Sequence, residues 1–219
     1  MIKKLSKKLY QPLIKPYKIV QTLNEFGHAK SIKKGLSVDK KGKPIPWFTY
    51  PSLHYLNQLD LKEKVVFEWG SGYSSVYFCS KSRKVFSVDH NKQWYEEVLK
   101  FKPVNHTLSL AEGEDYVNNI AQHNCKFDII VIDGILRGKC CKIAVNFLNE
   151  GGIIIFDNSD RHPEEAEYLR NQGLIEVDFH GFGPIGKHTW TTSIFFHRTF
   201  NFTPLNEQPA HPGGHDKVL

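Results

Sequence analysis

From residue 65 onward, short apolar runs alternate with stretches whose apolar residues recur at helical spacing. Runs of this length followed by helical patterns are typical of a parallel sheet whose strands are buried on both faces. The sequence therefore predicts an α/β fold. The predicted strands cover 65–68, 84–88, 106–111, 127–132 and 152–156, and the helices after them cover 74–80, 91–100, 114–121, 138–148 and 163–171.

The pattern changes at both ends of this alternating region. Two more strands, 174–180 and 191–197, flank the Gly-rich stretch GFGPIGKHTW, which indicates a hairpin-like connection. Pro51 opens a helix before the first strand, and short helices are expected within residues 3–25. The Gly-, Lys- and Pro-rich residues 33–46 indicate an exposed connection. We expect the Pro-containing tail, 199–219, to be extended or disordered.

The stretch VVFEWGSGYSS, residues 65–75, combines a buried strand, a glycine turn and the start of a helix. Gly70 and Gly72 allow a tight turn and the close approach of a ligand. The helix that follows points backbone N–H groups toward that ligand. Glu68 closes the strand, and Asp89 ends the next one, at a spacing suited to binding a ribose diol.

On these residues the chain resembles the class I S-adenosylmethionine-dependent methyltransferases, whose first motif is acidic-x-Gly-x-Gly and whose second is an acid after strand two. A nicotinamide or flavin Rossmann domain is the alternative, but its fingerprint expects Gly or Ala where Ser75 stands. The resemblance implies a Rossmann-like sheet of seven strands, the last antiparallel, with helices on both faces and an N-terminal helical arm. It divides the chain into a basic arm and linker, 1–46, a methyltransferase domain, 47–198, and the tail, 199–219.

The resemblance also implies where S-adenosylmethionine binds. Asp89 is expected to accept the ribose hydroxyls, although an acid here also suits a helix N-cap. Glu112 is the candidate for the adenine, with Glu114 and Asp115 as alternatives. Trp47, Thr49 and Tyr50 are candidates to cover the cofactor or to pack on the sheet. The full set of expected cofactor-binding residues is Glu68, Gly70, Ser71, Gly72, Tyr73, Ser74, Asp89, His90, Glu112 and Asp133.

Polar residues also end strands four and five. Asp133, Asp157 and Asn158 offer the oxygen ligands that Mg²⁺ or Mn²⁺ takes. They resemble the metal triad of catechol O-methyltransferases and of magnesium-dependent macrolide-sugar O-methyltransferases. Such a metal would hold a substrate diol and lower the pKa of one hydroxyl. The alternative is that these residues only cap the turns that follow the strands.

An O-methyltransferase also needs a group that deprotonates the acceptor. The candidates are Asp133, His162 and Asp160, and histidine is a common proton acceptor near neutral pH. The catechol enzymes have a lysine soon after the strand-four aspartate, whereas this chain has none until Lys139. This departure favours a sugar or glycan acceptor over a catechol.

Four more residues are candidates for contacts with the acceptor. Arg137 and Arg161 would bind an anionic acceptor or the cofactor carboxylate, or pair with neighbouring acids. His188 and Trp190 lie in the Gly-rich connection, which we expect to act as a lid. Trp190 could stack on a sugar or aromatic ring, but we favour the alternative that it begins the buried strand that follows.

Charge is distributed unevenly along the 219 residues. Residues 1–43 hold 12 lysines and two acidic residues, whereas the remainder is acidic overall. Such an arm would suit an anionic membrane surface or an acidic partner, or only a solvated face. The absence of an apolar start or span and the four scattered cysteines favour a cytoplasmic, reduced protein. The sequence also allows a homo-oligomer.

Two other functions remain open at this point. A nucleic-acid methyltransferase could use the basic arm, but no Asn/Asp-Pro-Pro-aromatic motif follows strand four and no Pro-Cys nucleophile is present. We therefore expect no nucleic-acid substrate. A non-catalytic binding module that keeps the methyltransferase fold is the second alternative. The intact Gly70, Gly72 and Asp89 argue against it, whereas failure to bind S-adenosylmethionine would argue for it.

Overall fold

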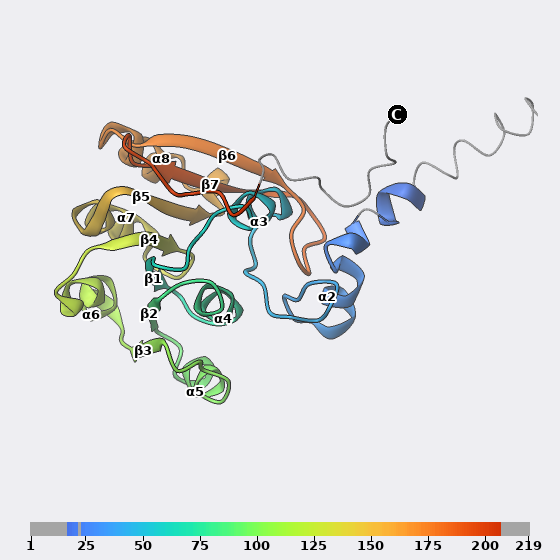
Figure 1. Cartoon of the computed structure of the whole chain (residues 1–219). Coiled ribbons are helices and arrows are strands. Elements are labelled where there is room, and N and C mark those ends of the chain that lie inside the picture. The colour runs from blue at the N-terminus through green and yellow to red at the C-terminus, as the bar shows by residue number, and fades with distance from the viewer. Residues whose placement is uncertain (1–16, 22, 207–219) are drawn as a thin grey trace, which may run out of the picture.

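The computed structural model describes residues 17–21 and 23–206, and its described part centres on a seven-stranded sheet (Figure 1). The strand order is β3-β2-β1-β4-β5-β7-β6, and β7 runs antiparallel to both of its neighbours. This confirms the predicted fold class. The strands are β1 Val65–Trp69, β2 Lys84–Asp89, β3 His106–Leu110, β4 Phe127–Ile132, β5 Leu148–Asp157, β6 Ile175–Gly181 and β7 Trp190–Phe196.

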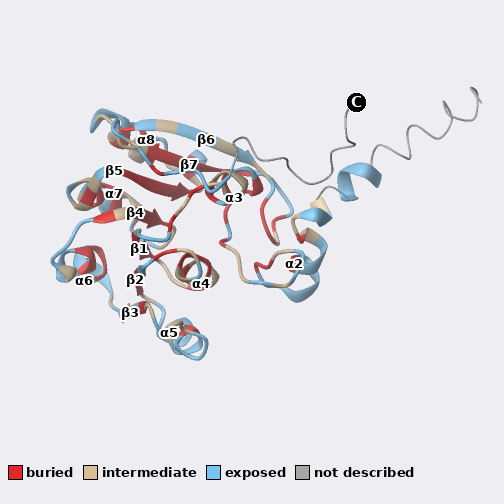
Figure 2. Ribbon diagram, in the orientation of Figure 1, coloured by how far each residue is buried: buried red, intermediate tan, exposed pale blue. Residues whose placement is uncertain are grey.

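Helices cover both faces of this sheet, and each face has its own apolar core. One core takes side chains from two helices, and the other takes side chains from three more. The strands between them are buried, while the helices expose their outer sides (Figure 2). The first core includes α3 Tyr50–Leu56 and α4 Tyr73–Cys79; the second includes α6 Gly113–Asn118, α7 Arg137–Phe147 and α8 Pro163–Asn171. The helix α5 Lys92–Leu99 contacts β2 and β3.

The central strand β1 shows why this sequence folds as it does. All five of its residues are buried. Phe67 and Trp69 contribute to the core that contains α6 to α8, whereas Val66 contributes to the opposite core. A parallel strand between two helical layers needs apolar side chains on both faces. Glu68 is an acidic residue at a buried position where an apolar side chain is expected. Packing in the core therefore does not explain it.

The register of the parallel strands brings their ends to one edge of the sheet. Trp69 pairs with Val88 on one side and with Ile132 on the other, and Ile132 pairs with Phe156. The residues that follow these strands are therefore neighbours in space although they are distant in sequence. Ligands of open α/β sheets bind at this edge.

Two helix predictions differ from the structure. The predicted helix 114–121 is divided into α6 and a short 3₁₀ helix, η1 Asn119–His123. The helix after β4 stops at Phe147, and β5 begins at the next residue instead of at 152. Strand β5 contains a register shift, and Gly151 has a φ of 75°, which a glycine adopts without strain.

The expectation of an exposed connection at 33–46 is wrong in part. The helix α2 His28–Lys34 ends at Gly35, and the chain then folds back so that Ser37 and Val38 are buried. Val38 forms an isolated antiparallel bridge with Pro44, and its carbonyl accepts a hydrogen bond from Ser31 Oγ at 2.7 Å. Lysines and glycines suggested exposure, but they alternate with side chains that pack inward. Residues 1–16 of the predicted arm lie outside the described residues.

The first part of the C-terminal tail packs against the domain. Phe202 is buried, and Pro204 forms an isolated bridge with Leu59. Asp60 N donates to the Thr203 carbonyl at 2.8 Å. Residues 207–219 of the predicted tail lie outside the described residues. Among the helices that the structure describes, none has the length and apolar character that a membrane span requires.

Candidate functional site

The turn between β1 and α4 is tightly built around its glycines. Gly70 has a φ of 102° and Gly72 a φ of 145°, both in the region that favours glycine. A Cβ on Gly72 would come within 3.0 Å of the Trp94 ring. The loop after β4 also lies close, since a Cβ on Gly134 would come 3.1 Å from Gly70 N. Two strand-end loops are therefore packed backbone against backbone.

Glu68 is the least satisfied polar group of this edge. Its side chain is buried, and neither carboxylate oxygen has a well-formed hydrogen bond within the described residues. Burial raises the pKa of Glu68 to about 7, and the nearby hydroxyls of Ser75 and Ser74 offset this only in part. A buried carboxyl group without a partner costs stability. Glu68 also lines a cavity, from which a bound molecule would reach the carboxyl group.

Asp89 lies opposite, at the end of β2, and is almost fully buried. Its Oδ2 accepts a hydrogen bond from Ser71 Oγ at 2.7 Å, and its Oδ1 accepts one from Asn91 N at 3.0 Å. The N-cap of α5 is Asn91, whose side chain accepts from Trp94 N. Asp89 is therefore held in a fixed orientation without being the helix cap, which leaves its remaining acceptor capacity facing the cavity.

Two adjoining cavities surround the glycine turn. The first has a volume of about 290 Å³, and most of the predicted cofactor residues line it: Glu68, Gly70, Ser71, Ser74, Asp89, His90 and Asp133. The second, of about 330 Å³, is lined by Gly72 and Tyr73 together with residues 35–37, Trp47 and Ile185. Glu112 lines neither cavity and is exposed before α6.

Trp94 contributes to both of these cavities, and the sequence analysis missed it. Its indole N–H donates to the Ser71 carbonyl at 2.8 Å, which fixes the ring against the glycine turn. A tryptophan in the first turn of α5 gave no signal beyond helical patterning.

The three residues predicted to cover the cofactor differ in position. Thr49 and Tyr50 are buried and form hydrogen bonds within the protein. Of the three, only Trp47 lines one of these two cavities.

Arg137 lies among the three residues that the sequence predicted as metal ligands. Its Nη2 donates to Asp133 Oδ1 at 3.0 Å and to the Asp133 carbonyl at 2.9 Å. Its Nη1 donates to the Asp157 carbonyl and to Asn158 Oδ1. Its Nε donates to the Gly134 carbonyl at 2.9 Å. One guanidinium group therefore joins the loops that follow β4 and β5.

Asp157 uses its side chain for contacts inside the protein. Its Oδ1 accepts hydrogen bonds from Trp190 Nε1 at 3.0 Å and from Thr192 Oγ1 at 2.5 Å. Burial raises the pKa of Asp157 well above its usual range, and the nearby Asp133 raises it further. A neutral carboxyl group with two donors on one oxygen is a poor ligand for a divalent cation.

These contacts do not fit the predicted magnesium site. A cation between Asp133 and Asn158 would face the N–H groups of Arg137, which already bind both side chains. Within the described residues no group of three His, Cys, Asp or Glu side chains is placed to hold a metal ion. The structure thus brings the three predicted ligands together as expected, but around a guanidinium group.

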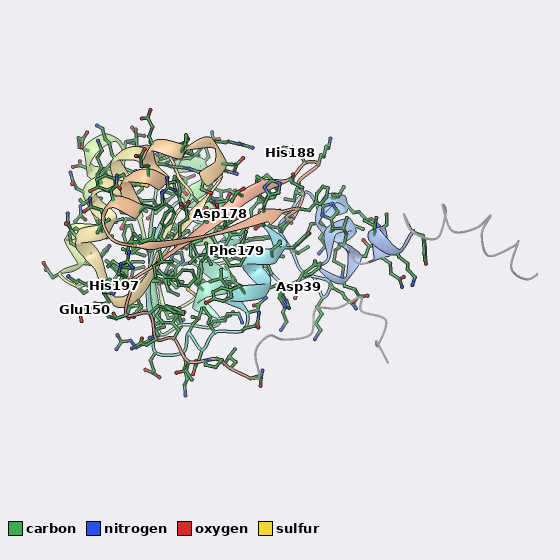
Figure 3. The ribbon with its side chains drawn as sticks, turned by 90° about the horizontal axis from the view of Figure 1, so that it is seen from above. Asp39, Glu150, Asp178, Phe179, His188 and His197 are labelled. Atoms are coloured by element: carbon green, nitrogen blue, oxygen red, sulfur yellow. The ribbon has the colours of Figure 1, made fainter. Side chains whose placement is uncertain are left out.

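A third cavity, of about 420 Å³, opens next to the cofactor cavities. It is lined by side chains from the strand ends and from the β6–β7 connection, among them Trp47, Asp133, Arg137, Arg161, His188 and Trp190. Asp133 lines all three cavities. His188 lies at the same end of the molecule as Asp39, whereas Glu150 and His197 lie at the opposite end (Figure 3). The cavity is therefore placed at the edge where the parallel strands end.

No family model and no curated protein matches this sequence. Solved structures do match it. The precorrin-6y C5,15-methyltransferase of Geobacter metallireducens GS-15 is 15% identical, with 76% of this chain and 96% of that chain covered and a TM-score of 0.55. The N-methyltransferase NodS of Bradyrhizobium japonicum WM9 is 13% identical, with 67% and 91% covered and a TM-score of 0.50. The fibrillarin pre-rRNA processing protein of Methanococcus jannaschii is 15% identical, with 63% and 67% covered and a TM-score of 0.52.

The chain has the class I S-adenosylmethionine-dependent methyltransferase fold. The proteins that share this methyltransferase fold differ in what their names describe: a methylation of a precorrin, an N-methylation and the processing of pre-rRNA. The fold therefore leaves the acceptor open, and only the residues of the site can narrow it.

Of the three predicted catalytic residues, the structure places Asp133 alone at the cavities. His162 precedes α8, where its ring packs against Phe156 and its Nδ1 lies 3.7 Å from Glu165 Oε2. Asp160 Oδ1 accepts a hydrogen bond from Thr191 N at 3.0 Å. Neither of these two side chains lines the cavity that contains Asp133.

Replacing Glu68 with Gln is expected to stabilise the ligand-free protein at pH 8. The folded protein keeps the Glu68 proton up to a pKa of about 7, against an ordinary value of 4.5. Wild-type stability therefore falls as the pH rises between these values, and Gln removes this loss. The gain is at most about 3 kcal/mol. Urea unfolding at pH 5 and pH 8 measures it, with the exposed Glu63→Gln as control. If the stability of Glu68→Gln depended on pH as that of the wild type does, Glu68 would not be the group whose raised pKa causes the loss.

Replacing Arg137 with Lys is expected to destabilise the protein by roughly 2–4 kcal/mol, because a lysine cannot replace the fork that joins the two loops. The Arg137 side chain is only 15% exposed. Arg170→Lys is the matched control, since the Arg170 pair with Glu176 is about half exposed on the arginine side and is worth at most about 1 kcal/mol. The denaturant midpoints of the two variants measure their losses of stability. Equal losses would mean that the hydrogen bonds of Arg137 contribute little to the free energy of unfolding.

Proposed function

We propose that the protein is an S-adenosylmethionine-dependent O-methyltransferase that acts on a hydroxyl group of a small acceptor, a sugar or glycan. The observation that carries this proposal is the position of Asp133. It lines the cavity of Glu68 and Asp89 as well as the cavity of Arg137 and His188. A carboxylate shared by a cofactor cavity and a neighbouring cavity is suited to accept a proton where two reactants meet.

The residues of the first cavity fit the cofactor. The unpartnered carboxylate of Glu68 supplies acceptors for an amino group, and the fixed carboxylate of Asp89 supplies them for a ribose diol. Trp94 adds a flat apolar surface at the glycine turn. When bound, S-adenosylmethionine supplies a methyl group on a positively charged sulfur, which makes it reactive without further activation.

Asp133 is the candidate general base of the second cavity. Removal from water raises the pKa of Asp133, and Glu68 raises it further, while Arg137 lowers it. A carboxylate with a raised pKa is a stronger base than an exposed aspartate and is still ionised at neutral pH. Arg137 holds this carboxylate in place through Oδ1. We therefore assign proton acceptance to Asp133 and its orientation to Arg137, without a metal ion.

The cofactor assignment predicts that S-adenosylhomocysteine binds the wild-type protein and that Asp89→Ala weakens binding at least about tenfold, because the paired acceptors for the ribose are lost. Isothermal titration calorimetry measures both affinities. The control is Glu63→Ala, which removes an exposed carboxylate that lines neither cofactor cavity. If the wild type binds no S-adenosylhomocysteine, the enzyme assignment fails.

The assignment of the base predicts that the rate of methyl transfer rises with pH as Asp133 loses its proton. Asp133→Asn should lower the rate by about 10²–10⁴-fold and remove this rise. Transfer of a labelled methyl group to a panel of hexoses, hexuronates and catechols provides the measurement.

The proposal also predicts that the reaction needs no metal ion. Adding EDTA should change the rate of methyl transfer by less than about twofold, because Arg137 occupies the region between the acidic residues. Transfer that occurs only to catechols and only with Mg²⁺ would contradict this mechanism.

A further inference from the structure

The third cavity contains positive charge that no described carboxylate neutralises. The guanidinium of Arg137 is paired with Asp133 at 3.0 Å. Arg161 also lines the cavity, yet it forms no ion pair with any carboxylate in the described part of the chain. An exposed arginine that lines a cavity and has no carboxylate partner keeps most of its five N–H donors available to a ligand.

A histidine stands beside this arginine. Arg161 Nη2 donates a hydrogen bond to His188 Nε2 at 3.5 Å, and the two residues come from different elements. Arg161 ends the short 3₁₀ helix η2 Ser159–Arg161 after β5, whereas His188 belongs to the β6–β7 connection. This bond uses one guanidinium N–H group and holds the arginine next to the imidazole. An anionic oxygen bound by the other N–H groups of Arg161 would therefore also lie beside His188.

The acids near this pair already have partners. Two of them line the same cavity: Asp133 is paired with Arg137 at 3.0 Å, and Asp157 Oδ1 accepts hydrogen bonds from Trp190 Nε1 and Thr192 Oγ1. Asp160, next to Arg161 in the chain, accepts a hydrogen bond from Thr191 N. Arg161 therefore lines the cavity without a carboxylate partner among the described residues, and it would attract an anion.

Two tryptophans also line the cavity. Trp47 lies with 52% of its surface exposed although it lines both this cavity and the one at the glycine turn. Trp190 is buried and held by its bond to Asp157, so it forms a rigid wall. An exposed indole beside a polar cavity provides a flat apolar surface for the C–H face of a sugar ring. The cavity volume of about 420 Å³ is in the range of small-molecule sites.

We propose that the acceptor is an anionic saccharide, whose carboxylate or phosphate is bound by Arg161 and His188 while its ring packs on Trp47. This inference rests on the proposed function and names the class of acceptor for that site. The shared chemistry is a sugar ring with one negative group; a uronic acid and a sugar phosphate are its two sources. Arg161 and His188 select the acceptor, whereas Asp133 takes the proton.

The test compares ligands that differ by one anionic group, in the presence of S-adenosylhomocysteine. Calorimetric titration uses D-glucuronate against methyl glucoside, and glucose 1-phosphate against glucose. The wild type should bind at least one acid about tenfold more tightly than its neutral partner, and Arg161→Gln should lose this preference. His188→Asn should reduce it. Arg198→Gln, an exposed arginine at the far end of β7, should keep it.

The possible outcomes distinguish the proposal of an anionic acceptor from the proposal of a methyltransferase. Equal binding of acid and neutral sugar, no binding of either acid at millimolar concentration, or a preference that persists in Arg161→Gln would overturn the acceptor assignment. A single-stranded RNA that displaces the acid and depends on Arg161 would also overturn it in favour of a nucleic-acid acceptor. If S-adenosylhomocysteine does not bind but the acid preference remains and needs Arg161, the anion site stands and the methyltransferase proposal fails.

Discussion

The hydrogen bonds of Arg137 hold the reacting edge of the sheet together. The guanidinium donates to groups after β4 and after β5, and it thereby sets the distance between two loops that share no other covalent or helical connection at this edge. Leu136 and Asn158, which flank its contacts, have positive φ angles of 52° and 55°. Such conformations cost about 1–3 kcal/mol each, and the hydrogen bonds of Arg137 offset that cost. The position of Asp133 follows from this arrangement.

The same edge concentrates acidic groups at the expense of stability. Glu68, Asp133 and Asp157 end three adjacent strands, and burial raises the pKa of all three. One arginine cannot neutralise three carboxylates. Asp157 is satisfied by donors from β7, Asp133 is held by Arg137, and Glu68 is left without a well-formed bond. A protein selected only for stability would bury an apolar residue at that position, so Glu68 carries a stability cost that the proposed cofactor would offset.

Local patterns predicted the fold and the glycine turn after β1 well because alternation of strands and helices, glycine turns and strand-ending acids are all encoded within a few residues. The convergence of Asp133 with Asp157 and Asn158 was predictable from strand order. The role of Arg137 was not, because it depends on the direction of a side chain at the start of a helix. His162 and Asp160 follow Asp157 closely in sequence, but the left-handed turn at Asn158 and the 3₁₀ helix carry their side chains away from the cavity. Trp94 reaches the site from α5, a contact that no short motif encodes.

The antiparallel β7 has a consequence for how such a protein changes over evolution. Because β6 and β7 form a hairpin, both ends of residues 182–189 return to one edge of the sheet, and a longer or shorter segment there leaves the register of every strand intact. The segment carries His188 but none of the residues that line the cavity of Glu68 and Asp89. Selection could therefore change what the neighbouring cavity binds by replacing this segment, while the cavity of Glu68 and Asp89 keeps its lining.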